Sequence, residues 1–155
     1  MKKYMADDIK PVDWEAHVRQ RPEMYFPASE VDAVEVAKAI EYSAKILGVV
    51  ETDFKEMDGW SYFCADEDWI FKSEFKFESI HKIFSGPSPF PEVKQQNAFR
   101  CESLCLAFSS SVYTASNGEV VVLKGSAPTD ALLEAHLKEL SGWGRVVGFK
   151  FIKSA

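Results

Sequence analysis

The stretch VYTASNGEVVVLK, residues Val112–Lys124, carries the clearest structural signal in the chain. Its centre is Asn117-Gly118, a pair that readily adopts the left-handed backbone of a two-residue type I′ turn. The residues on both sides are rich in β-branched side chains, which favour strands. This stretch therefore predicts a β-hairpin with strands over residues 112–116 and 119–124.

Helices and further strands are predicted on both sides of this hairpin. Apolar residues at helical spacing predict helices, and alternation or a flanking turn such as Asp58-Gly59 predicts strands. The predicted helices are 13–20, 30–47, 79–84, 97–109 and 129–140, and the other predicted strands are 49–55, 60–65, 69–77 and 145–152. The segment 69–77 alternates aromatic and polar residues most regularly. The order predicts an α/β (α+β) two-layer sandwich: a mixed, mostly antiparallel sheet with helices on one face, where 30–47 and 97–109 lie side by side.

Length and composition exclude several classes of protein. The chain has 155 residues, a net charge of −6 and 46% hydrophobic residues, which fits one folded domain over residues 1–155. No apolar run approaches the roughly 20 residues that span a bilayer, and the acidic balance argues against nucleic-acid binding. Three cysteines, an odd number, argue against a disulfide framework and favour a reducing cytoplasm.

The N-terminal segment carries a recognisable motif. Tyr4 precedes Ile9-Lys10, and residues 18–26 read VRQRPEMYF. This segment resembles the start of the DNA gyrase B subunit and related GHKL (Bergerat-fold) ATPases, where an arm tyrosine precedes I-K-V and A-V-R-x-R-P-G-M-Y-I-G. The rest of the chain matches that family in the order of its elements. The resemblance implies a GHKL-like domain over residues 11–155 and an N-terminal arm, residues 1–10, which in the family crosses to a second subunit.

The nucleotide motifs of that family are missing. Glu35 falls at the position of the general base, but the Mg²⁺-binding Asn falls on one of residues 38–40, none of which offers Mg²⁺ a suitable oxygen ligand. The D-D-G-R-G motif falls on residues 65–69 and the G-x-x-G-x-G loop on residues 95–102, and neither stretch contains a glycine. Backbone amides cannot wrap a triphosphate closely where Cβ atoms crowd the loop. We expect no ATP hydrolysis, no bound cofactor and a vestigial Glu35.

Residues of the N-terminal motif are candidates for partner or arm contacts. These are Tyr4, Ile9, Arg19, Arg21 and Tyr25. The two arginines could contact an anion or a partner, but the resemblance favours a structural role in holding the arm and the core together. We expect a homodimer in which residues 1–10 pack against the partner.

The aromatic content exceeds what one small core commonly needs. The chain contains 12 Phe, 4 Trp and 5 Tyr. We expect some of these to be exposed, around Trp60, Trp69, Phe90 or Trp143, as parts of a pocket or partner surface. Residues 86–91, with three prolines, could form its rim. Packing of all the aromatics in the core is the alternative.

No metal site is predicted. Cys101 and Cys105 have a spacing that two metal ligands could use, but both also lie on the apolar stripe of a predicted helix. The three histidines lie far apart in the sequence, and no paired cysteine motif accompanies them. The two cysteines are therefore interpreted as small core residues.

Three functions remain open. The first is a catalytically inactive GHKL-like domain, not an enzyme, that acts as a protein-binding or regulatory module. The second is a small-molecule-binding protein whose remodelled apolar pocket replaces the nucleotide site. The third is an acidic competitor of a gyrase-like enzyme, supported only by the net charge.

Overall fold

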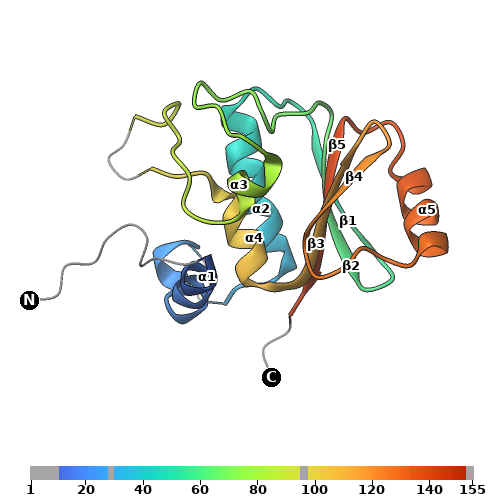
Figure 1. The fold of residues 1–155 in the computed structure, drawn as a ribbon, viewed down its shortest axis with the longest axis horizontal. Coiled ribbons are helices and arrows are strands. Elements are labelled where there is room, and N and C mark those ends of the chain that lie inside the picture. Colours follow the sequence, from blue (N-terminus) through green and yellow to red (C-terminus); the bar gives the residue numbers. More distant parts are fainter. Residues whose placement is uncertain (1–10, 28–29, 95–97, 153–155) are drawn as a thin grey trace, which may run out of the picture.

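A five-stranded sheet forms the centre of the molecule (Figure 1). The computed structural model describes residues 11–27, 30–94 and 98–152. Each pair of neighbouring strands is antiparallel, and the order is β1-β2-β5-β3-β4, so the strand that comes last along the chain lies in the middle. The strands are β1 (Thr52–Met57), β2 (Trp60–Ala65), β3 (Ser109–Ser116), β4 (Glu119–Lys124) and β5 (Arg145–Phe151).

Two tight hairpins form the outer parts of the sheet. Asp58 and Gly59 connect β1 to β2, and Asn117 and Gly118 connect β3 to β4. All four residues have positive φ angles between 51° and 82°, as the two central positions of a type I′ turn require. Both hairpins predicted from the sequence are therefore confirmed.

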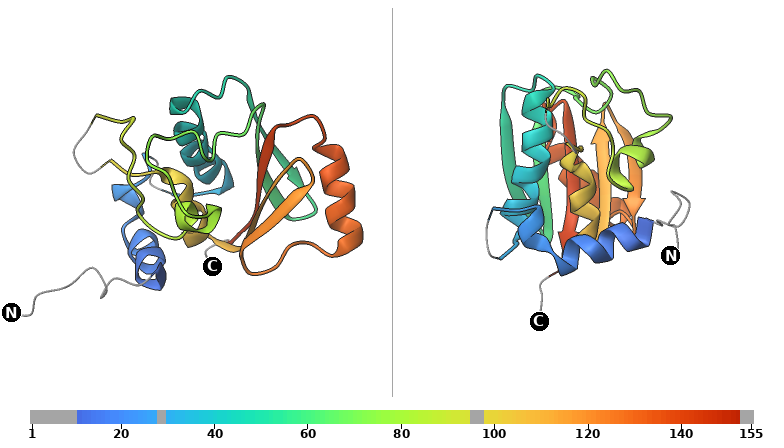
Figure 2. Two further views of the ribbon diagram at one scale, coloured as in Figure 1. Left: turned by 45° about the horizontal axis from the view of Figure 1, so that its top comes forward. Right: turned by 90° about the vertical axis from the view of Figure 1, so that its left-hand side faces the viewer.

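Helices cover both faces of the sheet (Figure 2). The helices are α1 (Pro11–Gln20), α2 (Ala33–Ile46), α3 (Ile80–Phe84), α4 (Leu104–Ala107) and α5 (Asp130–Glu139), with 3₁₀ turns at Pro22–Met24 and Cys101–Ser103. The α/β sandwich is confirmed, and α2 and α4 lie on the same face as expected. The prediction of helices on one face misses α5, which packs on the opposite face as a third layer. No helix in the described part of the chain is long and apolar enough to cross a membrane.

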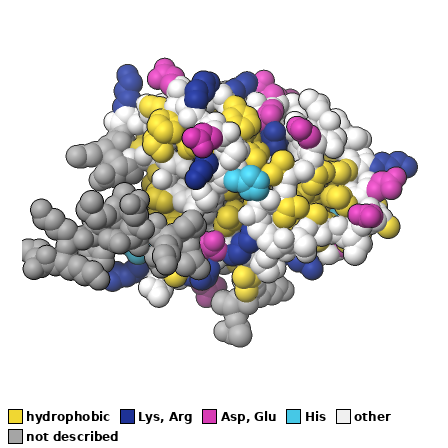
Figure 3. Space-filling view, viewed as in Figure 1, with side chains coloured by type: hydrophobic (Ala, Val, Ile, Leu, Met, Phe, Trp, Pro, Cys, Tyr) yellow, Lys and Arg dark blue, Asp and Glu magenta, His cyan; other side chains and the backbone are white. Residues whose placement is uncertain are grey.

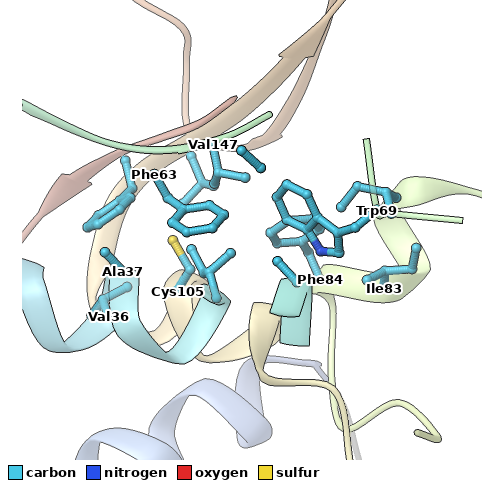
Figure 4. Packing of buried hydrophobic residues seen from close by; sticks show 14 of the residues in the cluster. Val36, Ala37, Phe63, Trp69, Ile83, Phe84, Cys105 and Val147 are labelled. Carbon is cyan, nitrogen blue, oxygen red and sulfur yellow. The ribbon is translucent and has the colours of Figure 1, made fainter. Parts of the chain in front are cut away.

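Alternation along the central strands supplies a separate core for each face. Phe63 and Val147 point toward α2 and α4, where they meet Ala37 and Cys105 (Figure 4). Val146, which precedes Val147 on β5, points to the opposite face and belongs to the second core, beneath α5. Full burial of one such large apolar side chain stabilises the fold by about 1.5–3 kcal/mol, so both helical layers are held chiefly by apolar contact.

The predicted strand over residues 69–77 is wrong. The segment forms turns and bends, and its backbone is held by side chains instead of a neighbouring strand. The Glu92 carboxylate accepts hydrogen bonds from Ser73 Oγ and the Glu74 N–H at 2.7 Å each, and Lys76 Nζ donates to the Phe71 carbonyl at 3.2 Å. Regular alternation along this segment therefore did not reflect strand pairing.

Two predicted helices are longer than the observed ones. The first turn of α2 begins after Asp32, whose side chain accepts the Glu35 N–H at 2.9 Å, so residues 30–32 precede the helix. Of the helix predicted over 97–109, the structure has only the 3₁₀ turn at Cys101–Ser103 and α4, among the residues that it describes. Asn97 lies outside the described residues. Ser109 instead begins β3, because it pairs with Phe151 of β5.

Candidate functional site

Four buried residues meet between the end of β2 and the start of α4. Trp69 and Ile70 follow β2, and Arg100 and Glu102 precede α4; all four are fully buried, with 0% exposure. We call them the Trp69 cluster. From the sequence, the positions of two nucleotide motifs are expected on residues 65–69 and 95–102, so the cluster is the first place to look for a functional site.

A buried ion pair forms the centre of the Trp69 cluster. Arg100 Nε lies 3.2 Å and 3.3 Å from the two Glu102 carboxylate oxygens, and Arg100 Nη2 donates to the same carboxylate. The other guanidinium nitrogen, Nη1, donates to the Ile70 carbonyl at 2.9 Å. Trp69 Nε1 completes the arrangement by donating to Glu102 Oε2 at 3.0 Å. Each buried charge therefore has a partner, as burial in a low-dielectric interior requires.

Aromatic rings surround this ion pair and fill the space around it. The Phe77 and Phe90 rings lie 5.8 Å and 6.0 Å from the Arg100 guanidinium carbon. The Trp69 indole meets Phe63 edge to face, with ring centroids 5.4 Å apart, and extends into the core beside Ile83 and Phe84 (Figure 4). Neither Glu102 nor Arg100 is accessible to a substrate in this arrangement, so the Trp69 cluster has a structural role.

The turn before Trp69 is fixed to the sheet by a second ion pair. Arg145 donates to both Asp68 carboxylate oxygens, at 2.6 Å and 3.0 Å, and its third nitrogen donates to Thr114 Oγ1 at 3.0 Å. Burial alone would raise the pKa of Asp68, but the Arg145 hydrogen bonds and charge outweigh it and hold the pKa below its usual value. A Cβ on Gly144 would lie 2.5 Å from the Glu67 Cα, so the turn packs directly on the backbone before β5.

Glu35 lies at the edge of an apolar groove. Its carboxylate is 3.8 Å from Lys38 Nζ, one turn further along α2. The groove has a volume of about 350 Å³ and is lined mainly by apolar side chains: Tyr25, Phe26, Pro27, Glu35, Lys38, Ala39, Tyr42 and Cys101. An acidic side chain paired with lysine beside apolar residues offers a binding surface. Among the described residues that line the groove, no second carboxylate or histidine accompanies Glu35 for acid–base chemistry.

The candidate contact residues of the N-terminal motif divide into three groups. Tyr4 and Ile9 lie outside the described residues. Arg19 Nη1 donates to the Ala107 carbonyl at 3.1 Å, which attaches α1 to the end of α4. Arg21 is exposed, 4.0 Å from the Glu23 carboxylate. Both arginines are exposed, and of the two, Arg19 contacts α4.

Tyr25 belongs to an aromatic cluster that joins α1 to the segment before α4. Its hydroxyl lies 2.7 Å from His17 Nδ1. Its ring meets Trp14 and Phe99 edge to face, at centroid distances of 5.4 Å and 5.8 Å. The Tyr25 side chain thus connects the N-terminal motif to the domain and also lines the apolar groove.

Three of the four aromatics expected at the surface are buried. Trp60, Trp69 and Phe90 are at most 4% exposed, so the prediction of exposure is wrong for them. Phe90 covers Arg100, and Trp60 lies in the core beneath α5, where Lys150 covers its ring. Trp143 is half-buried and lines a second groove of about 270 Å³ beside the β3–β4 turn. Among the aromatics that the structure describes, the exposed ones are instead Tyr42, Phe71 and Phe75.

A hydrogen-bonded network beneath α5 was not predicted from the sequence. The Tyr62 hydroxyl lies 2.6 Å from both the Tyr113 hydroxyl and His136 Nδ1, and His136 Nε2 lies 2.8 Å from Asp58 Oδ2. Burial, then the bond to Tyr113, raises the pKa of Tyr62. Only Asp58 is exposed, so the network joins α5 to the sheet and offers no hydroxyl to a substrate. The sequence feature that could have indicated this network is His136, a histidine on the apolar stripe of α5.

The cysteines are thiols in poorly solvated surroundings. Burial raises the pKa of Cys101 to about 11 and that of Cys105 to about 12. Such thiols are protonated at neutral pH and are weak metal ligands and nucleophiles. Within the described ranges, no group of three or more His, Cys, Asp or Glu side chains is arranged to hold a metal ion.

Comparison with known proteins assigns no family to this arrangement. No family model, curated protein or solved structure matches the chain.

Proposed function

We propose that this chain is a catalytically inactive GHKL-like domain that acts by binding another protein. The observation that carries the proposal is the Trp69 cluster, because an indole and a closed ion pair occupy the two segments on which the nucleotide motifs fall. ATP would have to displace a fully buried tryptophan and break the Arg100–Glu102 pair. Both changes are costly, since a buried charge that loses its partner is strongly destabilising.

The contacts of the N-terminal motif further support the proposal. Arg19 and Tyr25 connect this motif to α4 and to the segment before it. They therefore have a role in this fold that does not depend on nucleotide. The groove beside Tyr25 adds a place for a partner, because Tyr42, which lines it, is 50% exposed. Aromatic side chains are enriched at protein interfaces.

Nucleotide binding is the direct test of the inactive domain. Isothermal titration of the full chain with ATP and Mg²⁺ should give no heat of binding, and the melting temperature should not change. A magnesium-dependent rise of several degrees with ATP would contradict the proposal, because a ligand that binds only the folded state stabilises it.

Partner binding needs a separate test on the groove. A purified gyrase-type ATPase, with its ATP turnover as the readout, is the first partner to titrate with the chain. Tyr42→Ser should reduce any inhibition or binding, whereas Phe75→Ser, the same kind of change at a distant exposed aromatic, should not. Equal loss in both variants, or none in either, would reject the groove as the partner site. Inhibition that falls steeply with salt and ignores Tyr42→Ser would favour the acidic competitor instead.

A small-molecule-binding function is the second candidate, and the groove volume favours it. Ligand sites of about 300–1,000 Å³ are common, and this groove, at about 350 Å³, is mainly apolar. A thermal-shift screen with apolar metabolites should then find a stabilising compound. Ala39→Trp would fill the groove and should abolish that stabilisation, while Val50→Trp, outside the groove, should leave it unchanged.

A further inference from the structure

The two edge strands of the sheet differ sharply in character. β1 carries the charged residues Asp53, Lys55 and Glu56 along its length. Charges of this kind on an edge strand discourage pairing with another chain. β4 instead has four consecutive apolar residues, Val120–Leu123, between Glu119 and Lys124. β4 is therefore the edge at which strand addition is not opposed by charge.

The free side of β4 is open to pairing. β4 pairs with β3 along one side, and no other strand in the described part of the chain pairs with it. This edge faces the viewer in Figures 1 and 3, and hydrophobic side chains gather over it in the space-filling view. Val122 is 38% exposed although its strand neighbours are half-buried. Backbone donors and acceptors at such an edge serve as a template for another strand.

The hairpin register identifies which backbone groups point outward. Ser116 and Glu119 flank the two-residue turn and form its hydrogen-bonded pair, and Thr114 and Val121 form the next bonded pair. Bonded and non-bonded positions alternate along antiparallel strands. The N–H and C=O groups of Val120 and Val122 therefore point away from β3, toward the free edge.

We propose that β4 pairs antiparallel with β4 of a second copy of this chain, so that two five-stranded sheets become one continuous sheet. With the two-fold axis at Val121, Val120 of each chain lies opposite Val122 of the other, and each such pair exchanges N–H···O=C bonds. In this register, Val120 and Val122 of each strand both face an outward-pointing residue of the other strand. The interface is formed by residues of β4 and does not depend on the proposed function.

Charge favours the antiparallel orientation of a second copy over the parallel one. β4 begins with the exposed Glu119, whereas Lys124 at its end donates to Glu15 and to the Leu106 carbonyl of its own chain. Like charges on adjacent strands destabilise a pair. A parallel arrangement in register would place Glu119 beside its own copy, and the antiparallel register keeps the two carboxylates at opposite ends of the paired strands.

Light scattering coupled to size exclusion tests the pairing on the full chain. The wild type should elute with twice the 17.5 kDa chain mass. Val122→Lys should weaken the dimer by at least about tenfold, because it places a charge at the paired edge. Val50→Lys is the matched control, since Val50 is 72% exposed and precedes β1 at the opposite edge, and it should not change the dimer. A monomeric wild type at submillimolar concentration, or a dimer equally resistant to both changes, would overturn the proposal.

Two more variants keep the test independent of any folding defect. Val122→Pro removes an outward N–H that β3 does not use, so it should give a folded monomer with an unchanged circular dichroism spectrum. Val121→Cys should form an intermolecular disulfide under mild oxidation, because the two-fold axis places this residue opposite its own copy. Val50→Cys should not. Cross-linking of Val50→Cys with none at Val121→Cys would refute the register and the interface.

Discussion

The charge of Glu102 is a specific test of the buried ion pair. Glu102→Gln preserves the size of the side chain and an oxygen that can accept from Trp69 Nε1, but it removes the negative charge facing Arg100. Both side chains are fully buried, so the guanidinium would remain charged without a counter-ion. Removing one partner of a buried ion pair costs about 3–5 kcal/mol. Because a native domain is stable by about 5–15 kcal/mol, this loss should be plain in equilibrium unfolding.

Urea unfolding followed by circular dichroism measures this loss. For a slope near 2 kcal/mol/M, the midpoint of Glu102→Gln should fall by about 2 M. Glu67→Gln is the matched control, because the Glu67 and Lys72 side chains of that ion pair are 46% and 44% exposed. Exposed ion pairs contribute at most about 1 kcal/mol to the free energy of unfolding. If Glu102→Gln costs no more than Glu67→Gln, the ion pair does not hold this segment. The reasoning that the Trp69 cluster excludes nucleotide would then fail as well.

Three further predictions concern packing, acid stability and thiol reactivity. Gly148→Ala should destabilise the domain by about 1–3 kcal/mol in thermal unfolding, because its Cβ would lie 2.6 Å from the Tyr62 ring; an unchanged melting temperature would contradict this packing. Since Arg145 lowers the folded pKa of Asp68, that pair stabilises the fold above the unfolded pKa of about 3.9 and is lost as pH falls through the folded value. Unfolding free energies of wild type and Asp68→Asn should thus differ at pH 7 and converge in acid, and a constant difference would refute the assignment. With its pKa raised to about 11 by burial, Cys101 should react slowly with Ellman's reagent at neutral pH until the protein is denatured, and fast labelling of the native protein would argue against this environment.

Elements with a local signal were predictable from the sequence. The bounds predicted for 60–65 and 119–124 coincide with β2 and β4, because each strand adjoins a turn whose own two residues fix the register. The shared face of α2 and α4 followed from their apolar stripes. These features depend on residues near one another in the chain.

Elements decided by distant contacts were not predictable in this way. Alternation over 69–77 resembled a strand, but Glu92 binds the backbone of this segment from far along the chain. Arg100 and Glu102 are spaced as solvent-exposed charges often are, and only the fold shows that they are buried against Trp69. The sequence predicted the wrong aromatics as exposed for the same reason. Whether a tryptophan is buried depends on the residues that pack against it from distant parts of the chain, which no local pattern reveals.

The central position of β5 has a consequence for how the protein folds during synthesis. The β1–β2 and β3–β4 hairpins are each local, but β2 and β3 are joined only through β5. On the ribosome, neither hairpin can complete the sheet until residues 145–151 have emerged, and a lone two-stranded hairpin is marginally stable in water. We therefore expect the sheet to form late and in one step, with slow kinetics set by these long-range pairings. Until then, the inner edges of β2 and β3 remain open, and a chaperone that shields apolar strands would act on this nascent chain at that stage.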